Sequence, residues 1–299
     1  MLLSTQTDNV FAKCGVDEGL KIFAAAGYDA LDYSMFGMTN DDNFLNNCDV
    51  EAFAKELRGK AEAVGLCFNQ AHAPFPCWRN GDEAYNAKMP ARVANAIRIA
   101  GILGAKSIVV HPIAYIKPGD AQKAFNFEFY RSLEKVALDY GTKIALENMW
   151  GDNWDAMDEI LAEYPAQYIG ICYDSGHANS KSVGGKPFDM GYCQMDRLEK
   201  QKDRLEALHL HDNNGDGDQH QPPFYGNVDW ERLAKIIATS KSYPRPVSFE
   251  LSMSNTPFMD AERREKGEPQ TDEAVRAFLK DAYERCEKFG RMVEAAEAK

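Results

Sequence analysis

The feature that most constrains the fold is a regular alternation of short apolar runs with longer helical patterns along the 299 residues. The short runs have the length and residue types of buried strands, and the segments between them carry apolar residues at helical spacing. We expect strands near 2–7, 29–35, 66–72, 106–111, 143–148, 168–174, 206–211 and 246–251. We expect helices near 17–26, 50–64, 84–103, 121–140, 154–163, 193–204, 229–240 and 271–296. Eight strands alternating with eight helices in a chain of this length predict an α/β fold, a (β/α)₈ barrel (TIM barrel).

Glycines support the expected boundaries, because four of them fall between a helical pattern and the next strand, where a left-handed C-cap belongs. These are Gly27, Gly65, Gly104 and Gly141. No composition shift marks an internal boundary, so we expect 1–299 to form a single barrel domain. A doubly wound open sheet is the competing architecture, but no GxGxxG follows an early strand to support it.

The irregular stretches mostly follow strands rather than helices. They lie near 74–82, 112–120, 178–192, 212–228 and 252–270. In a (β/α)₈ barrel such loops gather on one face, which is the face that carries active sites. The fold therefore predicts where functional residues should be sought.

Charge and cysteine usage exclude several classes of protein. The formal net charge is -12, so long-range attraction to nucleic acid or to an anionic membrane is unfavourable. The seven cysteines are scattered and never spaced as CxxC, which fits neither a disulfide framework nor a thiolate zinc site. No signal peptide pattern and no membrane-length apolar run is evident, so a soluble, cytoplasmic protein is the default expectation. The oligomeric state stays open.

Residues of the kind that bind metals end six successive expected strands. They are His72, His111, Glu147, Asp174 (with His177 three residues later), His209 and Glu250. A single histidine at a strand end is more often a hydrogen-bonded structural residue than a ligand. A carboxylate after an apolar strand is less ordinary, because a buried charge must be paired or coordinated. Six such residues delivered to one rim predict a divalent-metal site.

The densest of these stretches begins at residue 207. Leu208 and Leu210 alternate with His209 and His211, so at the strand period of two both histidines share one face. The following loop adds Asp218 and His220. A polar loop with hydrogen-bonded histidines is the alternative for this stretch alone. Imidazole together with carboxylate favours zinc or manganese, with iron, cobalt or magnesium as further possibilities.

These residues fall in recognisable motifs: Leu146-Glu147-Asn148, Asp174-Ser175-Gly176-His177, His209-Leu210-His211-Asp212 and Phe249-Glu250-Leu251. In them the chain resembles the xylose-isomerase-like TIM-barrel superfamily, from about the second strand to the last helix. That superfamily contains sugar and sugar-phosphate isomerases and epimerases, and also endonuclease IV. The resemblance implies a metal-dependent enzyme acting on a sugar or sugar phosphate.

Epimerases of the tagatose/psicose type in this superfamily bind one metal through residues that match Glu147, Asp174, His209 and Glu250. The resemblance implies that Glu147 and Glu250 also exchange the substrate proton from opposite sides of a cis-enediolate, as base and acid. A metal that chelates the substrate oxygens would stabilise the enediolate charge. His177 would lie close enough to polarise the carbonyl oxygen.

Endonuclease IV offers the alternative, a multi-zinc phosphodiesterase. Its nine metal-binding side chains have counterparts in His72, His111, Glu147, Asp174, His177, His209, Asp218, His220 and Glu250. Several departures disfavour the nuclease: Ala-Pro-Phe-Pro-Cys-Trp follows His72, Asn-Met-Trp follows Glu147, and Gly176 stands where the nuclease has Cys. The negative net charge also argues against a basic surface that could bind a DNA duplex. We therefore favour an isomerase or epimerase, and a binding protein with a structural metal is a third, more remote class.

Side chains that could shape a substrate pocket lie in the loops after the ligand-bearing strands. They are Phe75, Trp78, Arg79, Trp150 and Phe224. Aromatic faces suit the C–H faces of a sugar, and an arginine could hold a phosphate or carboxylate. The alternative is that these aromatics only pack the rim. His211 is a candidate for a further ligand or for a partner of one.

Overall fold

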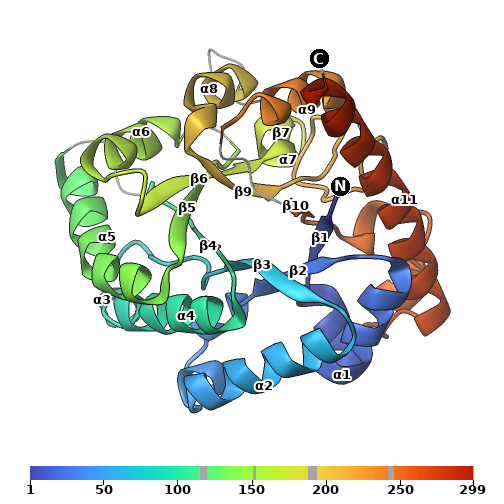
Figure 1. Ribbon diagram of the computed structural model, residues 1–299, viewed down its shortest axis with the longest axis horizontal. Coiled ribbons are helices and arrows are strands. Elements are labelled where there is room, and N and C mark those ends of the chain that lie inside the picture. Colours follow the sequence, from blue (N-terminus) through green and yellow to red (C-terminus); the bar gives the residue numbers. More distant parts are fainter. Residues whose placement is uncertain (115–119, 151–152, 188–193, 242–245, 299) are drawn as a thin grey trace.

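Eight parallel strands form a barrel in the computed structural model, which describes residues 1–114, 120–150, 153–187, 194–241 and 246–298 (Figure 1). The strands are β1 (Leu3–Gln6), β2 (Ala30–Ser34), β3 (Cys67–His72), β4 (Ser107–Val110), β5 (Lys143–Glu147), β6 (Ile169–Asp174), β9 (Leu205–His209) and β10 (Val247–Phe249). Their order in the sheet is β10-β1-β2-β3-β4-β5-β6-β9. A parallel bridge between Leu210 and Phe249 joins the two edges. The ring of strands therefore closes, and the predicted (β/α)₈ fold is confirmed.

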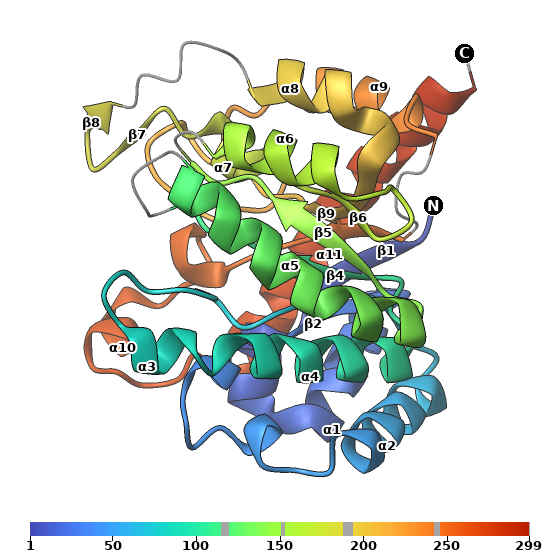
Figure 2. The same ribbon diagram turned by 90° about the vertical axis from the view of Figure 1, so that its left-hand side faces the viewer.

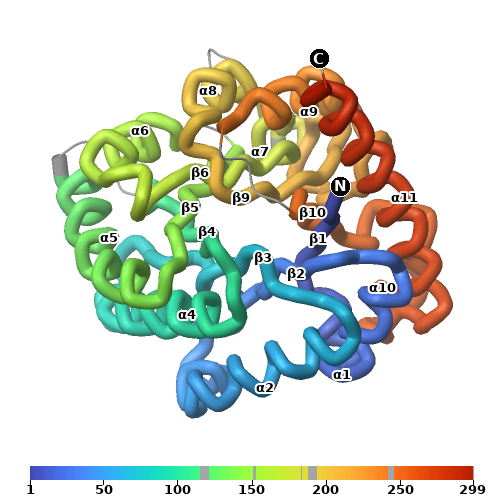
Figure 3. Tube along the Cα trace, in the orientation of Figure 1, coloured from blue at the N-terminus to red at the C-terminus, as the bar shows by residue number. Residues whose placement is uncertain are grey.

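Helices form the outer ring around the strands (Figures 1 and 3). The main ones are α1 (Asp8–Ala26), α2 (Val50–Ala63), α4 (Met89–Leu103), α5 (Asp120–Tyr140), α6 (Trp154–Glu163), α8 (Gln194–Gln201), α9 (Trp230–Ala238) and α11 (Asp272–Glu297). Side chains of Asp49, Asp229 and Thr271 accept hydrogen bonds from the first-turn amides of α2, α9 and α11. No described helix is long and apolar enough to cross a membrane.

Two helices differ from the sequence expectation for local reasons. Helix α1 begins at Asp8 rather than near residue 17, because the chain is already helical before a break at Gly15, whose φ of 74° is left-handed. The expected helix near 84–103 is divided into α3 (Glu83–Asn86) and α4. Pro90 lies in the first turn of α4, where its missing N–H is tolerated but where a continuous helix would lose a hydrogen bond. The four inter-element glycines all have positive φ, as predicted.

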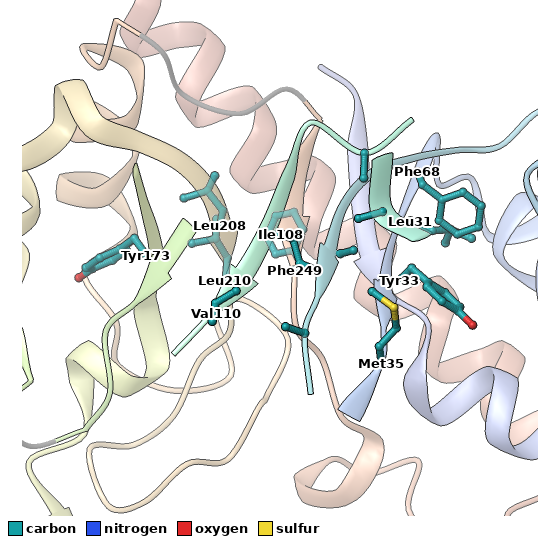
Figure 4. Close-up of a cluster of buried hydrophobic side chains, with 14 of the residues drawn as sticks. Leu31, Tyr33, Met35, Phe68, Ile108, Val110, Tyr173, Leu208, Leu210 and Phe249 are labelled. Atoms are coloured by element: carbon teal, nitrogen blue, oxygen red, sulfur yellow. The ribbon is translucent and has the colours of Figure 1, made fainter. Parts of the chain in front are cut away.

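The alternation of residues along each strand creates two packing layers. Outward-facing Ile108, Val110 and Leu208 pack with their neighbours into the main hydrophobic core between the strands and the helices (Figure 4). Inside the barrel a separate small cluster contains Val109, Ala145, Cys172 and Ala207. His111 follows Val109 by two positions, just after β4. In the same way Glu147 follows Ala145 on β5, and His209 follows Ala207 on β9. The period of two therefore brings the ligand-type residues inside the barrel, directly beyond its small apolar layer.

The loops that follow the strands lie at one end of the barrel, as predicted. Figure 2 shows α3, α7 (Ser175–Asn179), the hairpin of β7 (Ser182–Val183) and β8 (Lys186–Pro187), and α10 (Ala261–Glu265) together at that end. Of the expected loops, residues 115–119 and 188–192 lie outside the described residues, as does residue 193 at the start of the expected sixth helix. The structure thus assembles one functional face from loops that are far apart in sequence.

Candidate metal centre

Four side chains at strand ends converge in the middle of this face. Glu147, Asp174, His209 and Glu250 are all buried, and one potential ligand atom from each lies within 4.8 Å of the others. His209 Nδ1 is at the centre of the contacts, 3.1 Å from Glu147 Oε1 and 2.8 Å from Glu250 Oε2. This set, which we call the strand-borne set, has the donors and the spacing of a divalent-metal site.

The second oxygen of Glu147 faces two further histidines. Glu147 Oε2 lies 3.0 Å from His111 Nε2 and 3.4 Å from His72 Nε2, and the two imidazole nitrogens are 3.2 Å apart. The ring of His72 is also stacked on that of His209, with centroids 5.4 Å apart. Glu147 therefore connects the strand-borne set with His72 and His111.

A third group lies on the other side and depends on a loop. His220 Nε2 is 2.8 Å and His177 Nε2 is 3.4 Å from Asp218 Oδ2. His211 Nε2 lies 3.1 Å from Asp174 and 3.5 Å from Asp218 Oδ1, and its ring stacks on His220 at 4.1 Å. We call Asp218, His220 and His211 the loop-borne set. With it, the structure brings all nine candidate ligands into one continuous cluster of contacts.

His209 and His211 both turn into the cluster, but they contact different members of it. Strand β9 ends at His209, whose ring turns toward Glu147 and Glu250, whereas His211 turns toward Asp174 and Asp218. Pairing with β10 continues through the bridge between Leu210 and Phe249, and the chain then enters a loop in which Asp212 pairs with Gln221. The two histidines consequently serve different parts of the cluster.

Hydrogen bonds to the far side of each imidazole fix which nitrogen faces the carboxylates. Nδ1 of His72, His177 and His220 lies 2.7, 2.8 and 3.1 Å from the backbone oxygens of Ala73, Asn148 and Glu250. A carbonyl oxygen can only accept, so each Nδ1 donates and each Nε2 is left to face the cluster. Such partners orient metal-binding histidines.

Asn148 supports two candidate ligands through hydrogen bonds that the sequence did not predict. Its side chain accepts from the backbone N–H of Asp174 at 2.8 Å and donates to the carbonyl of Asp174 at 2.9 Å. Its own carbonyl accepts from His177. Because it directly follows Glu147, this residue joins the ends of β5 and β6 and sets the position of two candidate ligands.

Burial and charge act in opposite directions on the titratable groups. Burial would raise the pKa of Glu147, but the imidazoles of His209 and His111 bring that pKa well below its usual value. In the same way burial is outweighed by His209 at Glu250, whose pKa falls to about 2. Burial opposes a charge on His177 and His220, yet the neighbouring carboxylates raise their pKa values to about 10 and about 9. Near neutral pH Glu147 and Glu250 are therefore anions, and His177 and His220 hold protons in the absence of a competing cation.

Unpaired polar atoms show that the cluster fits a cation. Among the described residues, Glu147 Oε2, His209 Nδ1 and Asp218 Oδ1 are buried side-chain atoms without a hydrogen bond. A buried acceptor left unpaired costs about 1–3 kcal/mol. These atoms lie in different parts of the cluster, and a cation bound in each part would give them a partner, since oxygen and imidazole nitrogen are donors suited to a divalent metal.

Aromatic side chains cover some of the imidazoles at this face. The ring of Phe36 is 4.4 Å from His72, that of Phe75 is 4.1 Å from His111, and that of Trp150 is 5.0 Å from His177. Trp150 and Phe75 were predicted to shape a pocket, whereas Phe36 was missed. Its signal was its place just after β2, in a loop at the same end of the barrel.

The other predicted pocket residues make their described ring contacts elsewhere. Trp78 lies near Phe125, with centroids 6.4 Å apart, and the Arg79 guanidinium lies 3.9 Å from the Tyr85 ring centroid. Phe224 contacts Trp230 of α9 at 5.7 Å. None of these partners is a candidate ligand. Their part in substrate binding therefore remains a prediction, and that of Trp150 has the more direct support.

The fold and the cluster together define a (β/α)₈ barrel with histidines and carboxylates at the carboxyl ends of its strands. A model of the xylose isomerase-like TIM barrel family matches residues 20–282, and the chain belongs to this family. The resemblance seen in the sequence motifs is thus confirmed.

Individual relatives are more distant. The uncharacterised protein y4fM of Sinorhizobium fredii is 31% identical over 53% of this chain and 51% of its own length, so the match spans about half of that relative. A probable endonuclease 4 of Staphylococcus aureus is 24% identical over 56% of this chain and 58% of that protein.

Solved structures extend the fold similarity to almost the whole chain. A D-tagatose 3-epimerase-like protein superimposes with a TM-score of 0.67 at 19% identity, covering 99% of both chains. The IOLI protein with a bound zinc atom superimposes with a TM-score of 0.64 at 15% identity, again covering 99% of both chains. At these identities the likeness shows the fold alone.

Proposed function

We propose that the protein is a divalent-metal-dependent isomerase or epimerase of a sugar or sugar phosphate. One observation supports this above all: two buried carboxylates, Glu147 and Glu250, approach the same His209 nitrogen at 3.1 and 2.8 Å. Two carboxylates at one centre can remove a proton from a substrate carbon and return it from another side. The family and the epimerase-like solved structures agree with this chemistry.

Glu147, Asp174, His209 and Glu250 would hold the metal ion. Their mixture of one imidazole and three carboxylates favours manganese or zinc and permits magnesium or cobalt. When bound, a divalent ion would supply positive charge that acidifies the substrate C–H bond next to the carbonyl and stabilises the enediolate charge.

The chain's own residues supply the proton transfer. Glu147 and Glu250 have lowered pKa values, so both are ionised near neutral pH and either can accept the substrate proton. His177 has a raised pKa and would carry a proton that can be donated to a carbonyl oxygen. The roles predicted for these three residues are thus compatible with their electrostatic environment.

Aromatic rings would exclude water and position the substrate. Phe36, Phe75 and Trp150 each lie over an imidazole of the cluster. A sugar can place its C–H face on such rings while its hydroxyl groups reach the polar cluster. This combination of apolar cover and convergent polar groups is typical of small-molecule sites.

Solvent deuterium exchange tests the proposed chemistry. The purified protein, loaded with Mn²⁺, Zn²⁺, Co²⁺ or Mg²⁺ in turn, is incubated in D₂O with a panel of ketoses, aldoses and their phosphates. Exchange at a carbon adjacent to a carbonyl is the expected result, and Glu250→Gln should reduce it by about 10²–10⁴-fold. Glu206→Gln is the matched control, because Glu206 is a partly buried carboxylate paired with Lys143. Exchange that survives intact in Glu250→Gln would remove the proposed mechanism.

A phosphodiesterase like endonuclease IV is the second candidate. The observation that favours it is the contact network among all nine counterparts of its ligands, which a one-metal epimerase does not require. The net charge of -12 disfavours a DNA substrate. Elemental analysis separates the two. Two or three zinc ions per chain, reduced by both His72→Ala and Asp218→Ala, would favour the phosphodiesterase, whose test substrate is abasic-site DNA.

Gly176 gives a structural reason to prefer the isomerase. A Cβ atom at this position would lie 1.8 Å from His211 Cε1. A cysteine, which the nuclease pattern has here, is therefore incompatible with the observed place of His211. The glycine at position 176, where the nuclease has Cys, therefore goes with an arrangement of the cluster that differs from that of the nuclease.

A further inference from the structure

A buried carboxylate that is not among the candidate ligands lies against one of them. Asp32 on β2 is 1% exposed, and its Oδ2 atom is 2.9 Å from Nε2 of His209. The same oxygen accepts a hydrogen bond of 2.7 Å from the Gln70 side-chain amide. Isolated charges are rarely buried without a role, because their desolvation is costly. Asp32 therefore requires an explanation that the proton-transfer chemistry does not supply.

An irregularity in the sheet brings Asp32 beside Gln70. In the register of β2 and β3, Leu31 pairs with Phe68 but Asp32 pairs with Gln70, so that Asn69 is the extra residue of a bulge. Bulges of this kind redirect side chains next to functional sites. Here the shift places two polar side chains together inside the barrel, at the depth of the His209 ring.

Gln70 also reaches across the barrel to the strand that carries His209. Its Nε2 donates to the carbonyl of Leu208 at 3.0 Å, and its Oε1 lies 3.4 Å from the N–H of Leu208. Gln70 thus holds both Asp32 and the residue that precedes His209. The side chain and the backbone of the histidine are fixed relative to one another by a single amide.

The contact with Asp32 determines the protonation pattern of the His209 ring. An ionised carboxylate can only accept, so the proton of this hydrogen bond must be on Nε2 of His209. Nδ1 is then the atom that faces the oxygens of Glu147 and Glu250, at 3.1 and 2.8 Å, and a metal bound there would take the place of its proton. One imidazole nitrogen and two carboxylate oxygens that converge at these distances are arranged like a ligand shell around a cation.

We propose that Asp32, held by Gln70, is a positioning residue that fixes His209 as an Nδ1 ligand of the metal. The proposal rests on the proposed metal-dependent function and deepens it by assigning the support of its central ligand. Partners of this type contribute about 10–100-fold to metal affinity. Asp32→Ala should therefore weaken metal binding to the strand-borne set by that factor, and Asp32→Asn, which keeps an acceptor but loses the charge, by less.

The test measures metal affinity rather than turnover. Dissociation constants for Zn²⁺ and Co²⁺ are determined by competition with a chromophoric chelator for the wild type, Asp32→Asn, Asp32→Ala, Gln70→Leu and the control Glu206→Gln. The expected order of affinity is wild type and Glu206→Gln, then Asp32→Asn, then Asp32→Ala. Gln70→Leu should weaken binding as well, since it frees Asp32. The Co²⁺ absorption spectrum should change in the Asp32 variants, because the geometry of the bound ion changes.

Thermal unfolding with and without metal distinguishes positioning from a merely structural role. A positioning role predicts that the Tm increase produced by a fixed Zn²⁺ concentration is smaller in Asp32→Ala than in the wild type. If Asp32→Ala has a lower Tm but an unchanged metal dissociation constant, Asp32 contributes to stability alone. That result would overturn the inference and leave the proposed function intact. A wild type that binds no metal would overturn both.

Nitrogen-15 NMR of the zinc-loaded wild type provides a direct check that needs no variant. The expected result is a His209 ring with a proton on Nε2 and zinc on Nδ1. Zinc on Nε2 would overturn the inference irrespective of how the variants fold.

Discussion

The strand-borne and loop-borne parts of the metal centre contain similar residue types but are built in different ways. Glu147 and His209 end barrel strands and are each 1% exposed, whereas Asp218 and His220 belong to a loop and are 23% and 22% exposed. Strand ends are rigid positions, and loops tolerate more variation. We infer that the strand-borne set holds the ion that the chemistry requires, and that the loop-borne set determines whether a further ion or a proton occupies the neighbouring position.

The loop-borne set is nevertheless well anchored. His220 has a φ of 48°, which non-glycine residues seldom adopt, and its carbonyl accepts from Ser252 at 2.8 Å. Asp212 ties the loop down by accepting from Trp230 Nε1 at 2.9 Å and by pairing with Gln221. Backbone strain of this kind persists where the surroundings fix it, and it concentrates at functional sites. The two sets therefore differ in the exposure of their side chains and in how they are attached to the barrel.

Glu147→Gln should have the largest effect, because Glu147 contacts residues on both sides of the centre. Loss of its charge removes a metal ligand and a proton-transfer group together, so we expect deuterium exchange to fall by about 10²–10⁴-fold and metal affinity to fall as well. Exchange and metal content measured on the same preparation test this. A variant that keeps full metal content but loses exchange would show that Glu147 acts in proton transfer without being needed for metal retention.

Asp218→Ala should separate the two sets. This variant removes the carboxylate between His177, His211 and His220, and we expect any ion of the loop-borne set to be lost while that of the strand-borne set remains. Elemental analysis after gel filtration measures the result. If the wild type and Asp218→Ala both retain one ion per chain, the loop-borne set holds protons rather than metal.

Gly176→Ala should disturb the loop-borne set through packing alone. The added methyl group would overlap the His211 ring, and such overpacking costs about 1–3 kcal/mol of unfolding free energy. Gly59→Ala is the matched control, because that helical position has open space and should be neutral or stabilising. Chemical denaturation of both variants gives the values. The double variant Gly176→Ala/His211→Ala should recover stability relative to Gly176→Ala if the ring is the cause of the loss.

The strand-borne residues were predictable from the sequence, whereas the contacts that support them were not. The period of two in β5 and β9, with the rule that parallel strands end on one face, was enough to bring Glu147 and His209 together, and it also predicted His111 just after β4. Asp32 lies in an apolar strand, as Glu147 does, and the same reasoning about buried carboxylates should have flagged it. Its pairing with Gln70 depends on a bulge, which the local sequence does not reveal.

Contacts between loops were beyond sequence reasoning for a different reason. His211 packs against Gly176, which lies 35 positions earlier in the chain. Neither motif indicates that the two residues are in contact in the folded protein. The same holds for Phe36 over His72. Topology predicts which loops share a face, but side-chain packing within that face depends on the path of each loop, which is set by tertiary contacts.

The pH dependence of metal binding should distinguish the two sets more finely. His177 and His220 have pKa values raised to about 10 and about 9, so below pH 9 both hold protons that a metal at Nε2 must displace. Each displaced proton weakens apparent affinity about tenfold per pH unit as the pH falls. An ion of the loop-borne set that also takes the neighbouring His177 as a ligand should thus lose up to about a hundredfold in affinity per pH unit. An ion of the strand-borne set, whose one imidazole is that of His209, should lose about tenfold. Calorimetry between pH 6 and 8 in buffers of different ionisation enthalpy counts the released protons, and equal slopes for the two ions would contradict the division of the centre into two sets.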